Sequence, residues 1–186
     1  MRPVAALLAL GFATAAAAET PLPFDVGGPF TLTDHRGATR TQADPEGHPQ
    51  LLFFGYANCP GICGTALPLM AAVTESLAAQ GIALSPVMIT VDPARDTPET
   101  MGAPLARHHP DLIGLTGDNA ALAQAYAAFS VEHTLAYEDP EYGPVYAHGS
   151  MIYLMDAAGT VLTLFPPILD PARASEIALG YLAPEG

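Results

Sequence analysis

The stretch from Leu51 to Ala79 constrains the fold most strongly, because it joins a strand pattern to a helix pattern through a turn that contains both cysteines. Residues 51–56, Leu-Leu-Phe-Phe-Gly-Tyr, form a short apolar run that is typical of a buried strand. Apolar residues then recur at helical spacing, at Leu67, Met70, Val73 and Leu77. A thiol pair between the carboxyl end of a strand and a helix lies where open α/β sheets usually carry their chemistry.

The remaining segments predict further strands and helices around this unit. We expect a hairpin over residues 30–41 around the turn Asp34-His35-Arg36-Gly37 and a closing hairpin that joins 151–155 to 161–165. We expect other strands at 82–91 (starting properly after Pro86), 112–115 and 131–135, followed by an acidic loop at 137–144. Helices are predicted to begin at Thr97, at Asp118 or Asn119, and at Asp170, and to end near 109, 129 and 182. Alternating strands and helices indicate one α/β layer fold without a second domain.

The first 18 residues resemble a secretory signal. Arg2 is followed by an apolar core at 4–12 and by small residues at 16–18, which predicts cleavage after Ala18. The alternative is an uncleaved anchor, although the apolar run is short of the about 20 residues that span a bilayer. Residues 19–29 are rich in Pro and Gly and predict a linker, so we expect the folded domain to cover 30–186.

The charge balance excludes two classes of partner. The chain carries a formal charge of −13, with 19 acidic residues and six basic ones, all of them arginine. Such a surface repels nucleic acid and anionic lipid and attracts cations and basic protein surfaces. Membrane association is therefore expected only through the N-terminal segment.

Cys59 and Cys63 suit either a disulfide or a metal chelate. Four residues of helix place their Cα atoms roughly 6 Å apart, near the long end of the range that a disulfide bridges. A helix N-terminus favours the thiolate form, which is also the form that binds metals. Two thiolates are too few for a closed zinc site, whereas Cu(I) tolerates low coordination and prefers soft ligands. In an exported chain the pair is expected to be oxidised unless it is kept reduced or metallated.

A third ligand must come from a distant part of the chain. His148 precedes a predicted buried strand and, in a thioredoxin-like sheet, that position lies opposite the cysteine loop. It is the candidate ligand. The other five histidines lie in predicted loops or at helix ends and are expected to be solvated: His35, His48, His108, His109 and His133.

Three blocks of the sequence together resemble the Sco/SenC family. They are Phe53-Phe54-Gly55-Tyr56 before Cys59-Pro60-x-Ile62-Cys63, then Ile89-Thr90-Val91-Asp92-Pro93-x-Arg95-Asp96-Thr97-Pro98-Glu99, then His148 before Ile152-Tyr153-Leu154. The resemblance implies a thioredoxin-like fold with an N-terminal hairpin and family insertions, and a periplasmic location with or without anchoring to the inner membrane. It also implies that Cys59, Cys63 and His148 bind a copper ion, Cu(I) or Cu(II).

The resemblance further implies a role in the assembly of cytochrome c oxidase. The implied function is delivery of copper to the binuclear copper site of that oxidase, with its copper-bearing subunit or another copper chaperone as partner. The alternative is a thiol–disulfide reductase that keeps the copper-ligand cysteines of the oxidase reduced, so whether the protein is an enzyme stays open. A peroxidase is a weaker hypothesis, because the Pro/Thr/Cys environment it needs is not found.

Three positions depart from the family pattern, which commonly has Asp, Pro and Asp where this chain has Gly61, Gly64 and Ala147. Loss of an Asp beside His148 removes a partner that would orient the imidazole, and the glycines add flexibility beside the thiols. In the second block, Asp92 is expected near the metal loop. The alternative interpretation is a purely structural ion-pair network formed by Asp92, Arg95 and Asp96.

Overall fold

The structure is a computed structural model that describes residues 22–183. The predicted signal segment, Met1 to Ala18, lies outside the described residues. Within the predicted linker, residues 22–29 contain no helix or strand. No helix between residues 22 and 183 combines the length and the hydropathy that a membrane span requires.

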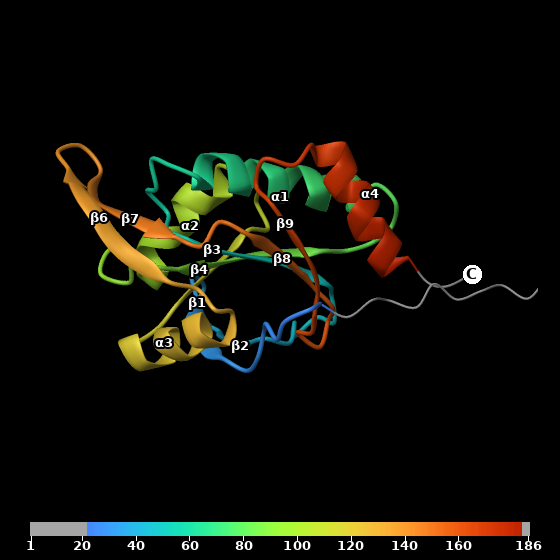
Figure 1. Ribbon diagram of the computed structural model, residues 1–186, viewed down its shortest axis with the longest axis horizontal. Coiled ribbons are helices and arrows are strands. Elements are labelled where there is room, and N and C mark those ends of the chain that lie inside the picture. The colour runs from blue at the N-terminus through green and yellow to red at the C-terminus, as the bar shows by residue number, and fades with distance from the viewer. Residues whose placement is uncertain (1–21, 184–186) are drawn as a thin grey trace, which may run out of the picture.

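A seven-stranded mixed sheet forms the centre of the described chain (Figure 1), in the order β2-β1-β5-β4-β3-β8-β9. The three central strands are parallel, and the hairpins at both edges pair antiparallel. This arrangement confirms the predicted α/β class. The strands of the sheet are β1 (Thr31–Asp34), β2 (Thr39–Thr41), β3 (Gln50–Gly55), β4 (Ser85–Thr90), β5 (Ile113–Thr116), β8 (Ile152–Met155) and β9 (Val161–Phe165).

Helices cover both faces of the sheet. The first, second and fourth helices lie on one face and the third on the other (Figure 1). Side chains of β3 alternate between the two cores, with Leu51 and Phe53 on the first face and Leu52 and Phe54 on the second. Burial on both faces explains why this strand is continuously apolar. The helices are α1 (Cys63–Ala78), α2 (Pro98–Ala106), α3 (Asn119–Ala128) and α4 (Pro171–Leu182).

The predicted helix starts are confirmed by their caps. Thr97 forms a capping box with Thr100 at α2, and the Asp118 carboxylate accepts the Ala121 amide at α3. The start predicted for the second buried strand is wrong by a few residues, since β4 begins at Ser85 and includes Pro86. The proline is tolerated because the Ser85 amide points toward β3, where it donates to the Pro49 carbonyl, so the nitrogen of Pro86 faces β5, and β4 pairs with β5 only from Val87.

The acidic loop predicted at 137–144 is also wrong, because this segment contains the end of one strand, the turn and the start of the next strand of a second, two-stranded sheet. Strands β6 (His133–Asp139) and β7 (Gly143–His148) pair with each other, and His133 lies opposite His148. Asp139 accepts the amides of Glu141 and Tyr142, and Gly143 takes a positive φ of 73° in the turn. Acidic side chains do not prevent pairing here, since β6 is exposed along almost its whole length.

Candidate metal centre

The cysteine half of the centre is built at the carboxyl end of β3. The Cys59 amide donates to the Tyr56 carbonyl at 3.2 Å, which closes a turn, and Cys63 is the first residue of α1. Gly55 makes room for this arrangement, because a Cβ there would lie 3.0 Å from the Cys63 Sγ and 2.6 Å from a Phe53 ring carbon. Cys63 is buried, whereas Cys59 is partly exposed, so the pair is accessible from the Cys59 side.

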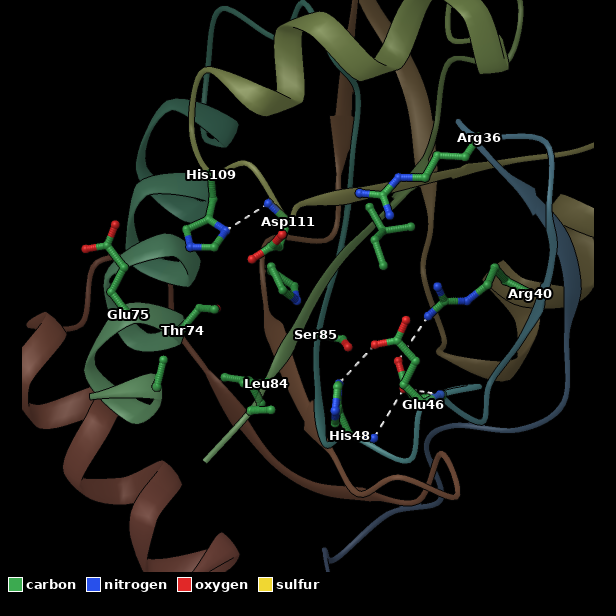
Figure 2. A pocket seen from close by; sticks show the side chains of 15 residues that line it. Arg36, Arg40, Glu46, His48, Thr74, Glu75, Leu84, Ser85, His109 and Asp111 are labelled. Atoms are coloured by element: carbon green, nitrogen blue, oxygen red, sulfur yellow. Dashed lines mark hydrogen bonds and ion pairs between the residues drawn. The ribbon is translucent and has the colours of Figure 1, made fainter. Parts of the chain in front are cut away.

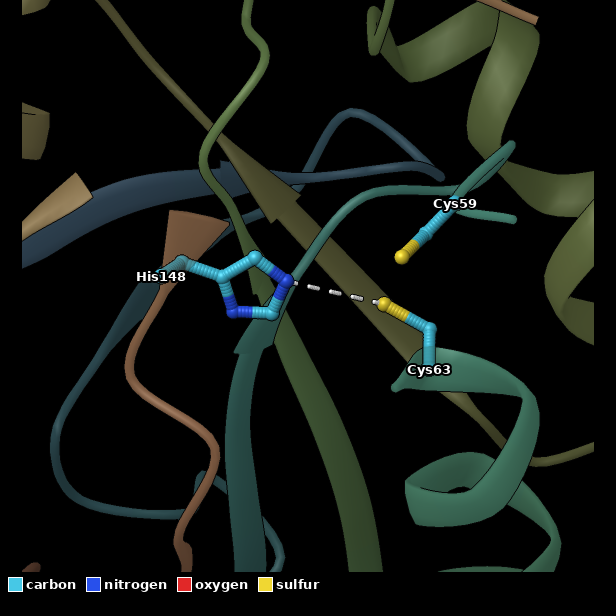
Figure 3. A group of neighbouring side chains, drawn as sticks. All are labelled: Cys59, Cys63 and His148. Carbon is cyan, nitrogen blue, oxygen red and sulfur yellow. Dashed lines mark hydrogen bonds between the residues drawn. The ribbon is translucent and has the colours of Figure 1, made fainter. Parts of the chain in front are cut away.

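The histidine half is the last residue of β7. One ring nitrogen of His148, Nδ1, lies 2.8 Å from the Gly149 carbonyl oxygen, which accepts its proton. This contact leaves Nε2 with its lone pair free, and Nε2 points toward the Cys63 Sγ at 4.0 Å (Figure 3). The Phe53 and Tyr56 rings pack edge-on against the imidazole at 5.8 and 5.9 Å between centroids. The tautomer and the orientation of His148 are therefore both set before any ion binds.

The three side chains converge on one point. The Sγ atoms of Cys59 and Cys63 and a ring nitrogen of His148 all lie within 4.8 Å of one another. Ligands about 2.0–2.3 Å from a shared three-coordinate ion would be roughly 4 Å apart, so a small closure of the loop suffices. Two thiolates and an imidazole form a soft donor set that suits copper better than hard cations.

The two thiols differ strongly in acidity. A hydrogen bond from the Cys63 thiol is the main cause that lowers the pKa of Cys59 to about 4, opposed by desolvation and helped by the amides of Cys63 and Gly61. The same hydrogen bond, together with burial, raises the pKa of Cys63. Since Ile62 at the start of α1 makes no side-chain cap, the Cys59 thiolate takes the place of a capping anion. The reduced pair thus shares one proton, held by Cys63.

Tyr56 and Gly149 belong to the centre but were not identified from the sequence as functional. Burial is the main cause that raises the pKa of Tyr56, and a hydrogen bond to Cys59 contributes, so the phenol stays protonated. The Tyr56 oxygen also accepts the Tyr146 amide at 3.3 Å. An aromatic residue at the end of a strand that precedes a Cys turn is a signal that could have identified Tyr56. No sequence signal identifies a backbone carbonyl such as that of Gly149.

The other histidines do not join the three ligand candidates. His109 is only 8% exposed, so the expectation that it is solvated is wrong: the Asp111 amide donates to its ring. His35 is partly buried, and its ring accepts the Gly114 amide at 3.1 Å. Burial lowers the pKa of His35. Both rings accept backbone amides, His35 from within β5 and His109 from the segment just before it.

A polar cavity of about 410 Å³ (Figure 2) is lined by residues at the starts of β4 and β5, so it lies at the opposite end of the sheet from the cysteines, which follow the end of β3. His48 and His109 line it, together with the buried ion pair between Arg40 and Asp44 at 3.0 Å. Asp44 also accepts the amides of Glu46 and His48, so this cluster organises the loop before β3. None of the three ligand candidates reaches this cavity.

The departures from the family pattern have small steric consequences. A Cβ at Gly61 would lie 3.8 Å from the Cys59 Sγ, an ordinary contact, and a Cβ at Gly64 would meet nothing within 4 Å. Both glycines are therefore places where the structure would accept a side chain. At the third position, the Gly149 carbonyl orients His148 from the backbone, so an Asp in place of Ala147 is not needed for that purpose.

Comparisons with known proteins agree with this geometry. A family model described as SCO1/SenC matches residues 18–182. A SCO2-like protein of Rickettsia conorii is 36% identical over 143 residues, which are 75% of this chain and 69% of that protein. The human mitochondrial SCO2 homolog is 36% identical over 80% of this chain, but the match spans only 55% of the human protein.

The structure of Bradyrhizobium japonicum ScoI with copper bound superposes with a TM-score of 0.74 and 34% sequence identity, covering 84% of this chain and 99% of that one. This similarity confirms the predicted thioredoxin-like fold. The family model matches nearly the whole chain, and the structure brings the cysteine turn and the distant histidine together. The chain belongs to the SCO1/SenC family.

Proposed function

We propose that this protein is a copper metallochaperone that delivers copper to the binuclear copper site of cytochrome c oxidase. The observation that carries the proposal is the convergence of the Cys59, Cys63 and His148 ligand atoms within 4.8 Å, with Nε2 of His148 free to bind. The copper-bound ScoI structure supports copper as the cargo, and the SCO homologues support a place in oxidase assembly.

The asymmetry of the thiols suggests the order of events. Cys59 is partly exposed and ionised, so its thiolate is the first group that an incoming copper ion meets. When Cys63 binds the ion, it releases the proton that the two thiols share. His148 then completes the set of three ligands without releasing a proton. Delivery reverses this order, as thiolates of the recipient replace Cys63 and His148 first and Cys59 last. Soft Cu(I) suits such exchange because it tolerates low coordination.

A copper titration of the reduced protein tests the site. We expect one copper ion per chain, and His148→Ala should weaken binding by more than the roughly 10–100-fold that loss of an outer partner costs. His133→Ala is the matched control, since it removes an exposed imidazole directly opposite His148 in the same hairpin. Equal affinity of the wild type and His148→Ala would remove His148 from the site. Absence of copper binding would refute the proposal.

The partner is proposed to be the copper-bearing subunit of the oxidase, or another chaperone that loads this one. The acidic surface favours a recipient with a basic face, which would speed encounter mainly at low ionic strength. Transfer from the loaded protein to the isolated copper-binding domain of that subunit is the direct assay. We expect transfer to be faster than from a small-molecule Cu(I) complex of equal affinity. Equal rates would argue against a delivery role.

The thiol asymmetry also favours a second candidate, a thiol–disulfide reductase. A partly exposed Cys59 thiolate would attack the partner disulfide, and Cys63 would then resolve the mixed disulfide, leaving the oxidised pair in this protein and two thiols in the partner. His148→Ala separates the two functions. A reductase should retain most of its rate of disulfide reduction in this variant, whereas a chaperone should lose copper affinity and oxidase assembly together.

We further propose that the protein acts outside the cytoplasm, in the periplasm, with residues 1–18 either removed after export or retained as an inner-membrane anchor. The apolar run after Arg2 supports export. Mass spectrometry of the protein from fractionated cells tests the location and the cleavage together. Recovery of the intact chain from the cytoplasmic fraction would refute the proposed location.

A further inference from the structure

The hairpin that carries His148 has few attachments to the rest of the described chain. Strands β6 and β7 pair only with each other and add no hydrogen bonds to the main sheet. Most of β6 is exposed and β7 is only half-buried, so apart from the Tyr146 ring, which packs against the Tyr56 ring, burial of apolar side chains fixes the hairpin weakly. Its position relative to the cysteine turn therefore depends on a small number of side-chain contacts.

Arg95, in the loop between β4 and α2, supplies the most extensive of these contacts. Its guanidinium donates to two backbone carbonyls of the hairpin, those of Tyr142 and of Pro144, the latter at 2.7 Å. Gly143 lies between them, and a Cβ there would be only 2.8 Å from Arg95 Nη1. Glycine is therefore required at this position both by the turn and by the close approach of the guanidinium. The Pro144 carbonyl is four residues from His148 on the same strand.

The other side of the guanidinium is held by the body of the protein. Arg95 Nε donates to the Asp92 carboxylate, which is 1% exposed. The guanidinium carbon also lies 5.6 Å from the centroid of the Tyr56 ring, the ring that packs against His148. A buried carboxylate on one side and an aromatic face on the other restrict the guanidinium to one orientation.

The same loop also holds the cysteine turn. The Asp96 carboxylate, 1% exposed, accepts the Ala57 amide at 3.0 Å and the Thr90 hydroxyl at 2.7 Å. Ala57 is two residues before Cys59. Residues 92–96 therefore contact the strand that ends in His148 through Arg95 and the turn that contains the thiols through Asp96.

We propose that Arg95 is a positioning residue of the copper site, which sets the distance between His148 and the two thiolates by fixing the β6–β7 hairpin to the loop that also holds the cysteine turn. This inference rests on the proposed copper site. Arg95 does not touch the ion. It acts by reducing the range of hairpin positions, so that His148 is already in place when copper arrives.

Copper affinity tests the proposal. Arg95→Gln removes the charge and both carbonyl contacts, and we expect copper to bind about tenfold more weakly, the smaller effect typical of an outer partner. Arg95→Lys keeps the charge, but a single ammonium cannot reproduce the guanidinium's fork, so we expect it to recover little. Arg173→Gln is the matched control, because it removes an equal charge from an exposed ion pair on α4. An unchanged affinity in Arg95→Gln would overturn the proposal.

A double-mutant cycle distinguishes positioning from a general loss of structure. If Arg95 acts through His148, Arg95→Gln should change copper affinity by about tenfold in the wild type and by less than about twofold when His148→Ala is already present. Electron paramagnetic resonance of the Cu(II) form should show weaker coupling to an imidazole nitrogen in Arg95→Gln, with thiolate ligation retained. Additive effects and unchanged nitrogen coupling would refute the inference.

Measurements without copper separate this inference from the proposed function. Amide hydrogen exchange of residues 133–148 should accelerate in Arg95→Gln, while exchange in β3, β4 and α1 stays near the wild-type rates. If amide exchange of residues 133–148 is the same in Arg95→Gln as in the wild type, the positioning role is refuted even if copper binds. Failure of the wild type to bind copper would refute the site itself, whatever the hairpin does.

Discussion

The acidity of Cys59 leads to a quantitative prediction about the reactivity of the reduced, metal-free protein. The thiol of Cys63 donates a hydrogen bond that lowers the pKa of Cys59 from the ordinary value of 9.0 to about 4. Because a thiolate and not a thiol reacts with iodoacetamide, the rate at Cys59 should be nearly constant above about pH 5. An ordinary thiol should instead slow about tenfold for each pH unit below its pKa.

The expected size of the effect depends on pH. At pH 5 an ordinary thiol is about 0.01% ionised, whereas Cys59 is about 90% ionised. A thiolate is also less nucleophilic when its pKa is lower, and a pKa difference of about five units reduces its nucleophilicity by about 100- to 300-fold. Cys59 should therefore react about 30–100-fold faster than an unfolded cysteine at pH 5, and at about the same rate at pH 7. The pH profile is thus a sharper test than any single rate.

The assay is alkylation of the reduced protein over a range of pH, with the modified residue identified by mass spectrometry and the denatured chain as reference. Cys63→Ala removes the donor and should raise the pKa of Cys59 and slow alkylation at pH 5. Cys63→Ser keeps a hydroxyl donor and should retain part of the effect. Modification of Cys63 before Cys59, or a profile parallel to that of the denatured chain, would refute this account of the thiol pair.

Three further predictions concern stability. Gly55→Ala should cost about 1–3 kcal/mol in thermal unfolding, because the added Cβ would overlap the Phe53 ring at 2.6 Å and crowd the Cys63 Sγ at 3.0 Å; a variant as stable as the wild type would show that this corner of the core is loosely packed. Tyr153→Phe should cost about 1 kcal/mol in a denaturant titration, since it removes the buried hydrogen bond to the Phe129 carbonyl without changing ring packing, and no loss would mean that the carbonyl finds another donor. Cu(I) at a free concentration 100 times its dissociation constant should stabilise the reduced protein by about 2.7 kcal/mol, and a melting temperature insensitive to copper would contradict binding to the folded state.

The elements that the sequence predicted well are those specified by neighbouring residues. Helix starts at Thr97 and Asp118 follow from side chains that bond to amides within three residues, and the β8–β9 hairpin follows from two apolar runs around a short turn. The start of β6 overlaps the strand predicted at 131–135, but residues 137–144 were predicted as a loop, because an exposed strand and a half-buried strand that pair only with each other leave no pattern of buried residues to detect.

Cys59 and Cys63 could be chosen as a pair because four residues of chain bring them together through local geometry alone. His148 is 85 residues from Cys63; its position before a predicted buried strand and the family resemblance made it a candidate, and only the structure places its Nε2 at 4.0 Å from the thiol. The burial of His109 and the contacts of Arg95 with carbonyls 47 and 49 residues away had no counterpart in local spacing.

The sequence by itself therefore determined most of the strands and helices and the dithiol turn, because these depend on interactions between residues close along the chain. The tertiary structure alone decided which histidine reaches the sulfur atoms and which arginine holds it there. Those contacts join segments whose separation is set by the packing of the sheet and its hairpins, and no periodicity within a single segment reports that packing.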